Sequence, residues 1–253
     1  MLVSHKKNGM YLYLVMVTLS LYLPEANAVE KPRVFSAKYT IDYSIASGEM
    51  VVRYSKGKAK NEFVYSTETK ATGLASIIAS GPLTMNSRFL VGENGLTPMG
   101  LITKDDARQG KDNAQLSFDW KAQQANYKDR KGEKSVKLIN GIQDVLSVQI
   151  AVMKDLAAGK TPLKYSVIEK GGRLRAHEYH KIKEETLSVS GRSYRTVRYD
   201  LKRQDSNRVM IYWFVPELDF LPVRMRQIKI DKETKKKKTV FTANLTSVEG
   251  LQQ

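Results

Sequence analysis

Side chains that do nucleophilic or metal chemistry are scarce in this sequence. It has three histidines and no cysteine, and two of the histidines lie in the run His177-Glu178-Tyr179-His180. On a helix, residues three apart share a face and can hold zinc with a third ligand. This run has the pattern of a β-strand, in which residues three apart point to opposite faces. We therefore interpret both as surface histidines on a basic strand and predict no metal site.

Carboxylates are the remaining candidates for catalysis. Asp105-Asp106 and Asp112 share a polar loop, but the spacing and the closing Glu of an EF-hand are missing. The sequence also has no glycine-rich phosphate loop, nucleophile elbow or HExxH motif. We therefore predict no cofactor and no catalytic residue, and we expect a protein that is not an enzyme. An enzyme that acts on envelope glycans through two carboxylates is kept as a third alternative.

The sharpest charge feature is a run of four lysines in a chain of formal net charge +16. The run is Lys235, Lys236, Lys237 and Lys238. At a hairpin tip, each ammonium group near an anionic lipid surface contributes about 1 kcal/mol to binding. The alternative is a solvated turn that only discourages strands from pairing edge to edge. These lysines are the candidate contact surface for anionic lipid or cell-wall polymer.

The first 28 residues indicate where the protein works. Basic residues 5–7 precede the uncharged, mostly apolar stretch 10–23, and Ala26-Asn27-Ala28 places small residues where a signal peptidase cleaves. About 14 apolar residues are too few to span a bilayer, which needs about 20. Cleavage after Ala28 would leave one β-rich domain over residues 29–253.

We therefore expect export to a bacterial periplasm as a soluble protein. The chain has no cysteine to accept a lipid, which argues against a lipoprotein. Basic chains often bind nucleic acid, but an exported location favours envelope lipids and polymers as the anionic partners instead.

Alternation of apolar and polar residues predicts β-strands over most of the chain. The clearest example is 34–45, where six apolar residues occupy every second position. So many regularly spaced strands predict a mainly β fold: one curved antiparallel sheet rolled into a barrel or half-barrel. The expected strands are 34–45, 50–54, 62–69, 85–91, 97–103, 115–120, 124–129, 163–169, 173–184, 186–189, 194–202, 208–215, 222–230 and 239–248.

Two segments predict helices packed on the concave side of that sheet. Residues 144–158 repeat apolar side chains at helical spacing, with Asp144 as the N-cap and Gly159 at the end. Residues 73–80 are short and apolar and stop at Gly81-Pro82, because proline cannot continue a helix.

These helices and one aromatic strand provide the candidate lining of a ligand cavity. In the strand, Tyr212 and Phe214 share one face, whereas Trp213 and Val215 share the other. Core packing explains the aromatic cluster as well as a cavity does. The candidate cavity residues are Leu74, Ile77, Ile78, Val148, Val152, Trp213 and Phe214.

Several stretches give the chain a family resemblance. They are the start FSAKYTIDYSI, Gly95-Leu96-Thr97-Pro98, LSFDW at 116–120, GIQDVLS at 141–147, and Trp213 followed by Leu221-Pro222-Val223. In this order they resemble the bacterial exported proteins grouped as domain of unknown function 3108, over residues 35–249. The resemblance implies a β-rich periplasmic fold and supplies no catalytic residue. More distantly, a sheet with a helical lid is similar to the half-barrels of periplasmic lipoprotein carriers, which hold acyl chains in an apolar concavity.

We therefore predict a non-enzymatic periplasmic binding or carrier protein that holds an apolar or lipid-like ligand in the concavity of the sheet. The alternative is an envelope scaffold that touches anionic lipid or cell-wall polymer through its basic surface, as a peripheral membrane contact. Ligand identity, oligomeric state and protein partners are left open, as is whether side chains fill the concavity.

Overall fold

The computed structural model describes residues 33–43, 46–93 and 95–251. The expected signal peptide lies outside these residues. By its internal contacts the chain divides into two units, 1–31 and 32–253, and the fold below is that of the second. Within the described ranges, no helix is long and apolar enough to cross a bilayer.

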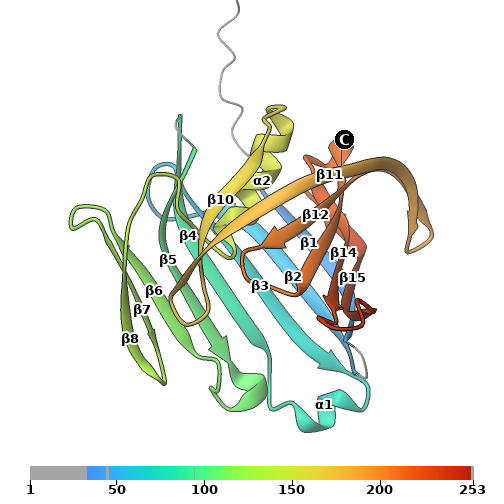
Figure 1. Ribbon diagram of the computed structural model, residues 1–253, viewed down its shortest axis with the longest axis horizontal. Coiled ribbons are helices and arrows are strands. Elements are labelled where there is room, and N and C mark those ends of the chain that lie inside the picture. Colours follow the sequence, from blue (N-terminus) through green and yellow to red (C-terminus); the bar gives the residue numbers. More distant parts are fainter. Residues whose placement is uncertain (1–32, 44–45, 94, 252–253) are drawn as a thin grey trace, which may run out of the picture. The chain divides into compact units, whose positions relative to one another are not determined.

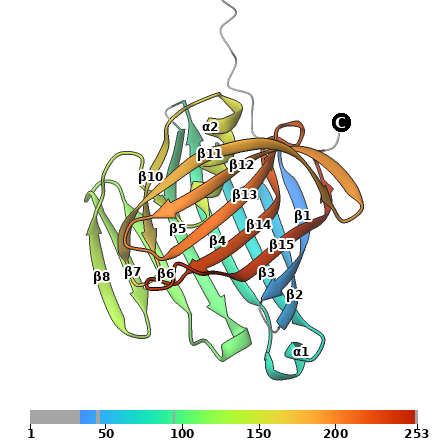
Figure 2. The same cartoon turned by 45° about the vertical axis from the view of Figure 1, so that its right-hand side comes forward.

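The described chain forms a single sheet of 15 strands that curls into an open roll (Figures 1 and 2). From β1 to β8 and from β10 to β15, consecutive strands pair in antiparallel hairpins, and β1 pairs with β15 to join the two halves of the chain. The short strand β9 runs parallel to β10. The prediction of a mainly β, curved antiparallel sheet is confirmed. The strands are β1 (Phe35–Tyr43), β2 (Ala46–Lys56), β3 (Glu62–Thr72), β4 (Leu83–Gly92), β5 (Gly95–Asp105), β6 (Ala114–Asp119), β7 (Gln124–Asp129), β8 (Gly132–Lys137), β9 (Gln143–Asp144), β10 (Leu163–Glu169), β11 (Arg173–Val189), β12 (Arg192–Arg203), β13 (Arg208–Val215), β14 (Leu221–Ile230) and β15 (Lys237–Glu249).

The roll is held by the apolar face of the sheet, which turns inward. In β1 the alternate residues Phe35, Ala37, Tyr39 and Ile41 are buried, whereas their neighbours are exposed or half-buried. Each large apolar side chain buried in this way contributes about 1.5–3 kcal/mol. The hydroxyl of Tyr39 donates a hydrogen bond of 2.9 Å to the carbonyl of Pro222 on β14, so its polar end is satisfied as well.

Helix α2 (Ser147–Ala157) lies inside the concavity (Figure 1). Its residues Val148 and Val152 are almost fully buried, as expected for a helix with a broad apolar face. The helix begins at residue 147, three residues later than predicted, because Asp144 belongs to β9. The Asp144 carboxylate nevertheless accepts hydrogen bonds from the amides of Leu146 and Ser147, at 2.8 and 2.9 Å. It therefore satisfies amide donors at the helix start without being the N-cap residue.

Asp144 also closes the roll. The hydroxyl of Ser87, on β4, donates a hydrogen bond of 2.7 Å to the second oxygen of this carboxyl group. Both residues are fully buried. Burial raises the pKa of Asp144, although the hydrogen bonds that it accepts oppose the rise. One edge of the sheet is thereby fastened to the inner face of a strand from the other half.

Helix α1 (Ala75–Ile78) corrects one expectation, because it does not cover the concave side. It lies in the β3–β4 connection, beyond the ends of the strands and at the end of the roll away from α2 (Figures 1 and 2). Leu74 is 84% exposed and Ile77 is 79% exposed. A hairpin connection this short cannot reach back over the sheet, and α2 already occupies the interior.

Two strands also differ from the sequence prediction. Strand β8 was not expected, because nearly all of its residues are exposed and it shows no apolar alternation. Strand β11 is one continuous strand of 17 residues rather than two, with a register irregularity between Lys181 and Lys183. Hydrogen bonding to a neighbouring strand, which leaves no trace in an apolar pattern, defines both elements.

Candidate functional site

The β10–β11 hairpin folds back over the inner faces of β4 to β7. Its turn, Lys170-Gly171-Gly172, packs against β7 and β8. A Cβ added at Gly172 would lie 3.1 Å from the Cβ of Tyr127 and 3.2 Å from the Cδ of Lys134. Gly172 also has a positive φ of 63°, so both its conformation and the close approach favour glycine. This contact places the hairpin as a cover over the first half of the sheet.

An apolar pocket of about 150 Å³ lies under this cover. Its floor consists of two cross-strand rows on the inner face of the sheet, in which the residues of each row are register partners. Ile168 of β10 covers them. The pocket therefore has a largely apolar wall built by four strands and closed by a fifth. The rows are Met85, Thr103 and Ala114, and Leu101, Leu116 and Tyr127.

A basic cleft of about 610 Å³ adjoins the pocket. Asp112, Tyr127 and Lys170 line both spaces, so the two spaces meet at these three residues. Seven basic side chains line the cleft against two acidic ones. The basic residues are Arg108, Lys111, Arg130, Lys131, Lys134, Lys170 and Arg173, and the acidic residues are Asp112 and Asp129.

The boundary between the two spaces is a small ion-pair cluster. The ammonium of Lys170 lies 2.5 Å from the carboxylate of Asp112, which also binds Arg108. The hydrogen bond from Lys170 is the main cause of the lowered pKa of Asp112. Buried Asp105 supports this loop by accepting hydrogen bonds of 3.1 Å from Arg108 and from the amide of Asp112. The carboxylate of Asp112 is thus charged at neutral pH.

Most of the positive charge in the cleft is not neutralised by protein. Lys111, Arg130, Lys131, Lys134 and Arg173 line it, and none of them forms an ion pair with another residue in the described ranges. Such an excess of one sign in a concave site raises the local concentration of anions.

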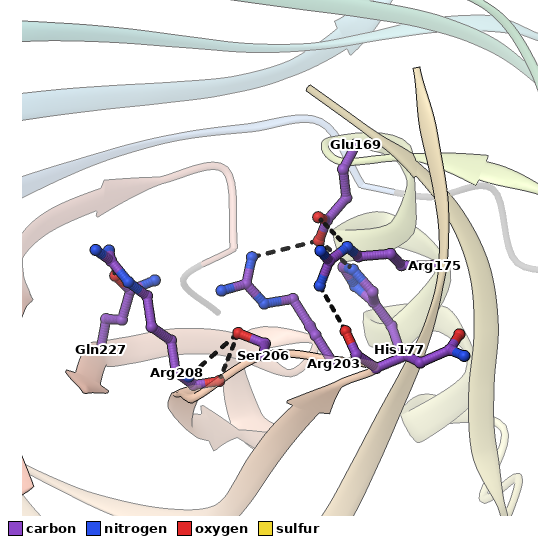
Figure 3. A network of polar contacts seen from close by, with 8 residues as sticks. Glu169, Arg175, His177, Arg203, Ser206, Arg208 and Gln227 are labelled. Atoms are coloured by element: carbon purple, nitrogen blue, oxygen red, sulfur yellow. Dashed lines mark hydrogen bonds and ion pairs between the residues drawn. The ribbon is translucent and has the colours of Figure 1, made fainter. Parts of the chain in front are cut away.

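A second polar cluster fixes the end of β10, next to Lys170. The Nε2 of His177 donates a hydrogen bond of 2.9 Å to the carboxylate of Glu169, and Arg203 and Arg175 contact the same carboxylate at 3.3 and 3.4 Å. Figure 3 shows the side chains of His177, Arg203 and Arg175 converging on Glu169. Burial favours the neutral acid, but the hydrogen bond from His177 and the charge of Arg203 outweigh it, so the pKa of Glu169 is lowered. The cluster therefore anchors the hairpin that covers the pocket.

The interpretation of both histidines as surface residues is wrong for His177. Its side chain is buried, at 5% exposure, because it faces the interior and is the partner of Glu169. His180 points to the other face and lies 3.6 Å from Glu178, so the expectation that the two do not converge is correct. Among the described residues, no group of three or more His, Asp or Glu side chains has a metal-binding arrangement.

The sequence-predicted cavity residues do not meet around one space. Val152 and Phe214 do lie together, but the gap between them is only about 10 Å³, too small for a ligand. Val148 is buried on the same helix. Side chains thus fill the concavity around α2. Leu74 and Ile77 are exposed at the other end of the roll, and the side chain of Ile78 lies outside the described residues.

Trp213 faces away from the expected cavity. Its ring lies between the guanidinium groups of Arg198 and Arg226, each 5.6 Å from the ring centroid, and its Nε1 donates a hydrogen bond of 2.9 Å to Glu185. The alternation along β13 explains this, because Trp213 and Phe214 are adjacent and so point to opposite faces. Lys235 and Lys236 lie in the β14–β15 connection, and Lys237 and Lys238 begin β15. All four are exposed and line neither the pocket nor the cleft.

Sequence reasoning missed the residues that form the pocket and its polar boundary. The apolar alternation of β5, β6 and β7 marks Leu101, Leu116 and Tyr127 as inward-facing. It does not reveal that β10, far along the chain, covers them. The only local signal is Lys170-Gly171-Gly172, where consecutive glycines permit a close approach between two layers.

Comparison with solved structures supports the fold. The crystal structure of a β-barrel-like protein of domain of unknown function DUF1849 from Brucella abortus matches with a TM-score of 0.53 and 10% identity, covering 86% of this chain and 97% of that one. A porin-like protein from Bacteroides uniformis aligns over 84% of this chain and 97% of its own, at 10% identity, with a TM-score of only 0.20. The comparison with curated proteins found no match.

A family model settles the relationship that the sequence motifs suggested. The model described as protein of unknown function (DUF3108) matches residues 35–236. This range runs from the first residue of β1 to the β14–β15 connection, and so includes every strand that forms the pocket and the cleft. The chain belongs to the DUF3108 family.

Proposed function

We propose that the protein binds an anionic amphiphile, with its apolar group in the pocket and its charged group in the basic cleft. The observation that carries this proposal is the shared boundary, because Asp112, Tyr127 and Lys170 line both spaces. An apolar space that opens directly onto a cluster of cations matches a molecule that is apolar at one end and anionic at the other.

The size of the pocket limits the apolar group. A dry cavity of about 150 Å³ lined by aliphatic side chains accommodates a molecule of about the size of benzene. The pocket has this volume, so we expect it to accept about six carbon atoms of a chain or ring. Each buried methylene would contribute about 0.8 kcal/mol. A longer acyl chain would need the β10–β11 hairpin to move.

The charges at the boundary provide recognition of the anionic group. Lys170 is largely exposed and pairs with Asp112 at the surface, and a surface ion pair contributes only about 0–1 kcal/mol. A phosphate or carboxylate of the ligand can therefore replace Asp112 as the partner of Lys170 at small cost. Asp112 opposes binding, because it is a negative charge beside the anion that enters.

We propose a role in binding or carriage rather than in catalysis. A glycan-cleaving pair of carboxylates needs one acid whose pKa is raised. Asp112 and Asp129 both line the cleft, but cations lower the pKa of Asp112. The proposed site of action is the bacterial periplasm, supported by the signal-like pattern of residues 1–28. The cell envelope is a source of anionic amphiphiles.

The test is titration calorimetry with three probes: hexyl phosphate, inorganic phosphate and 1-hexanol. We expect hexyl phosphate to bind at least about tenfold more tightly than inorganic phosphate or 1-hexanol, because only hexyl phosphate uses both the pocket and the cleft. Lys170→Gln should weaken its binding and Asp112→Asn should strengthen it.

The matched control is Lys164→Gln, since Lys164 lies on β10, the strand that leads into the Lys170 turn, with a similarly exposed side chain but outside both spaces. This variant should bind hexyl phosphate as the wild type does. Equal binding of hexyl phosphate and inorganic phosphate, with no response to Lys170→Gln, would overturn the proposal.

A further inference from the structure

The β3–β4 connection ends in an exposed apolar tip, formed by Leu74 and Ile77. These are the two most exposed large hydrophobic residues in the described chain, at 84% and 79%. Three residues apart on a helical turn, they share one side of the tip. The sequence has no charged residue between Lys70 and Arg88. A whole connection is therefore uncharged at a point where surface turns are usually polar.

We propose that this tip docks on an anionic lipid bilayer, with Leu74 and Ile77 entering the boundary between headgroups and acyl chains. The proposal is independent of amphiphile binding, because the docking residues line neither the pocket nor the cleft. It commits to lipid as the occupant because of the charges around the tip.

Basic residues lie in other connections at the same end of the sheet as the apolar tip. Successive antiparallel hairpins place the β3–β4, β5–β6 and β7–β8 connections at one end of the sheet (Figure 1). The last two carry Arg108, Lys111, Arg130 and Lys131. The pairing of β15 with β1, and of β1 with β2, brings the β14–β15 connection and its lysines to the same end. An uncharged tip with cations at the same end of the sheet is complementary to an anionic membrane surface.

The connection that carries the tip packs against the β5–β6 loop, which lines the basic cleft. The amide of Asp106, at the start of the β5–β6 loop, donates a hydrogen bond of 3.0 Å to the carbonyl of Pro82, just after the tip. A Cβ at Gly81 would lie only 2.9 Å from the Cβ of Asp106, so the two connections pack closely. Docking through the tip would therefore bring Arg108, which lines the cleft, towards the membrane surface.

Neither the apolar tip nor the basic residues are sufficient alone for stable attachment to a membrane. Stable membrane attachment generally requires two signals, such as one apolar anchor together with a polybasic patch. Two apolar side chains form a small anchor, and scattered surface cations are screened by salt. Together they predict binding that requires anionic lipid, weakens in high salt and depends on the tip.

The absence of native cysteine permits a direct test in the full chain. A single environment-sensitive fluorophore is attached at Ile77→Cys and, as the control, at Ile182→Cys in the middle of β11, where Ile182 is 48% exposed. Vesicles of phosphatidylcholine with phosphatidylglycerol are compared with vesicles of phosphatidylcholine alone. We expect the probe at position 77 to leave water only with the anionic vesicles, and the probe at 182 to remain in water. A probe at 77 that stays in water on anionic vesicles would contradict the proposal.

A second measurement uses the double variant Leu74→Ser/Ile77→Ser. Its partitioning onto anionic vesicles should fall by about tenfold or more, since two apolar side chains no longer enter the lipid. Ile139→Ser/Ile182→Ser removes two exposed isoleucines elsewhere and should bind as the wild type does. Equal partitioning of all three proteins would overturn docking through the tip. Retained binding of hexyl phosphate by the tip variant keeps the two proposals separate, because the pocket is untouched.

Discussion

Two regions of the same concave face differ in how they are covered. Around α2, the space between Val152 and Phe214 is about 10 Å³. Under the β10–β11 hairpin it is about 150 Å³. A helix presents a broad apolar face that interdigitates with the sheet, whereas a strand presents every second side chain. The covering element, rather than the sheet, thus determines where this protein is filled and where it is open.

The first prediction concerns the filled region and has the largest effect. Phe214→Ala should lower the free energy of unfolding by about 3–5 kcal/mol, because the tightly packed ring leaves a cavity that its neighbours cannot close. Urea denaturation measures the change. A loss below about 1 kcal/mol would show that the space around α2 is not tightly packed.

The second prediction concerns the hairpin that covers the open region. Glu169→Gln should lower the free energy of unfolding by about 2–3 kcal/mol at neutral pH, since Arg203 and His177 lose a charged acceptor. The pKa of Glu169 is lowered in the folded state, so the stabilisation by the wild-type carboxylate is present above its unfolded pKa and is lost as the pH falls through the folded value.

Unfolding curves of the wild type and Glu169→Gln should therefore converge in acid. A difference between the two proteins that is constant with pH would argue against a stabilising charge on Glu169.

The third prediction concerns Asp144 in the filled region, whose pKa is shifted in the opposite direction to that of Glu169. The pKa of Asp144 is raised by burial, so the folded state holds the proton more tightly and ionisation of Asp144 costs stability as the pH rises from the unfolded pKa to the folded one. Asp144→Asn should remove this loss, so that its stability relative to the wild type improves with rising pH. Thermal unfolding across the acid range measures this difference in stability. A stability of Asp144→Asn that falls relative to the wild type as the pH rises would contradict a raised pKa of Asp144.

The fourth prediction has the smallest effect and concerns the empty pocket. Ala114→Leu places a larger apolar side chain where Ala114 lines the cavity, so it should leave stability unchanged or raise it by about 1 kcal/mol. The same variant should weaken the binding of hexyl phosphate. A strongly destabilised Ala114→Leu protein would indicate that the pocket is smaller than its volume suggests.

The sequence predicts the fold well where one face of a strand is buried. In β7, Gln124–Asp129 has the predicted bounds and buries alternate residues, and the alternation in β1 matches its buried face. Prediction fails where pairing alone makes the strand, as in the exposed β8. It also fails for Asp144, a suitable N-cap by residue type that pairs with Ile168 of β10 and so belongs to β9.

The candidate site could be predicted only in part, because it depends on contacts between distant segments. Leu101 and Leu116 face inward in the pattern of their strands, but Ile168 covers them from a strand about 50 or more residues further along the chain. Ile77 shows the converse, since an apolar residue in a short apolar segment indicates burial and yet is exposed. Neither outcome is encoded in local spacing.

Chemical-shift mapping of methyl groups during titration with hexyl phosphate tests the central claim most directly. Leu101, Leu116 and Ile168 line the open pocket, and Val152 lies in the filled region. We predict that the methyl signals of the first three shift in a saturable way and that the signal of Val152 does not. Shifts at Val152 without shifts at Leu101, Leu116 and Ile168, or no saturable shift at all, would contradict the account.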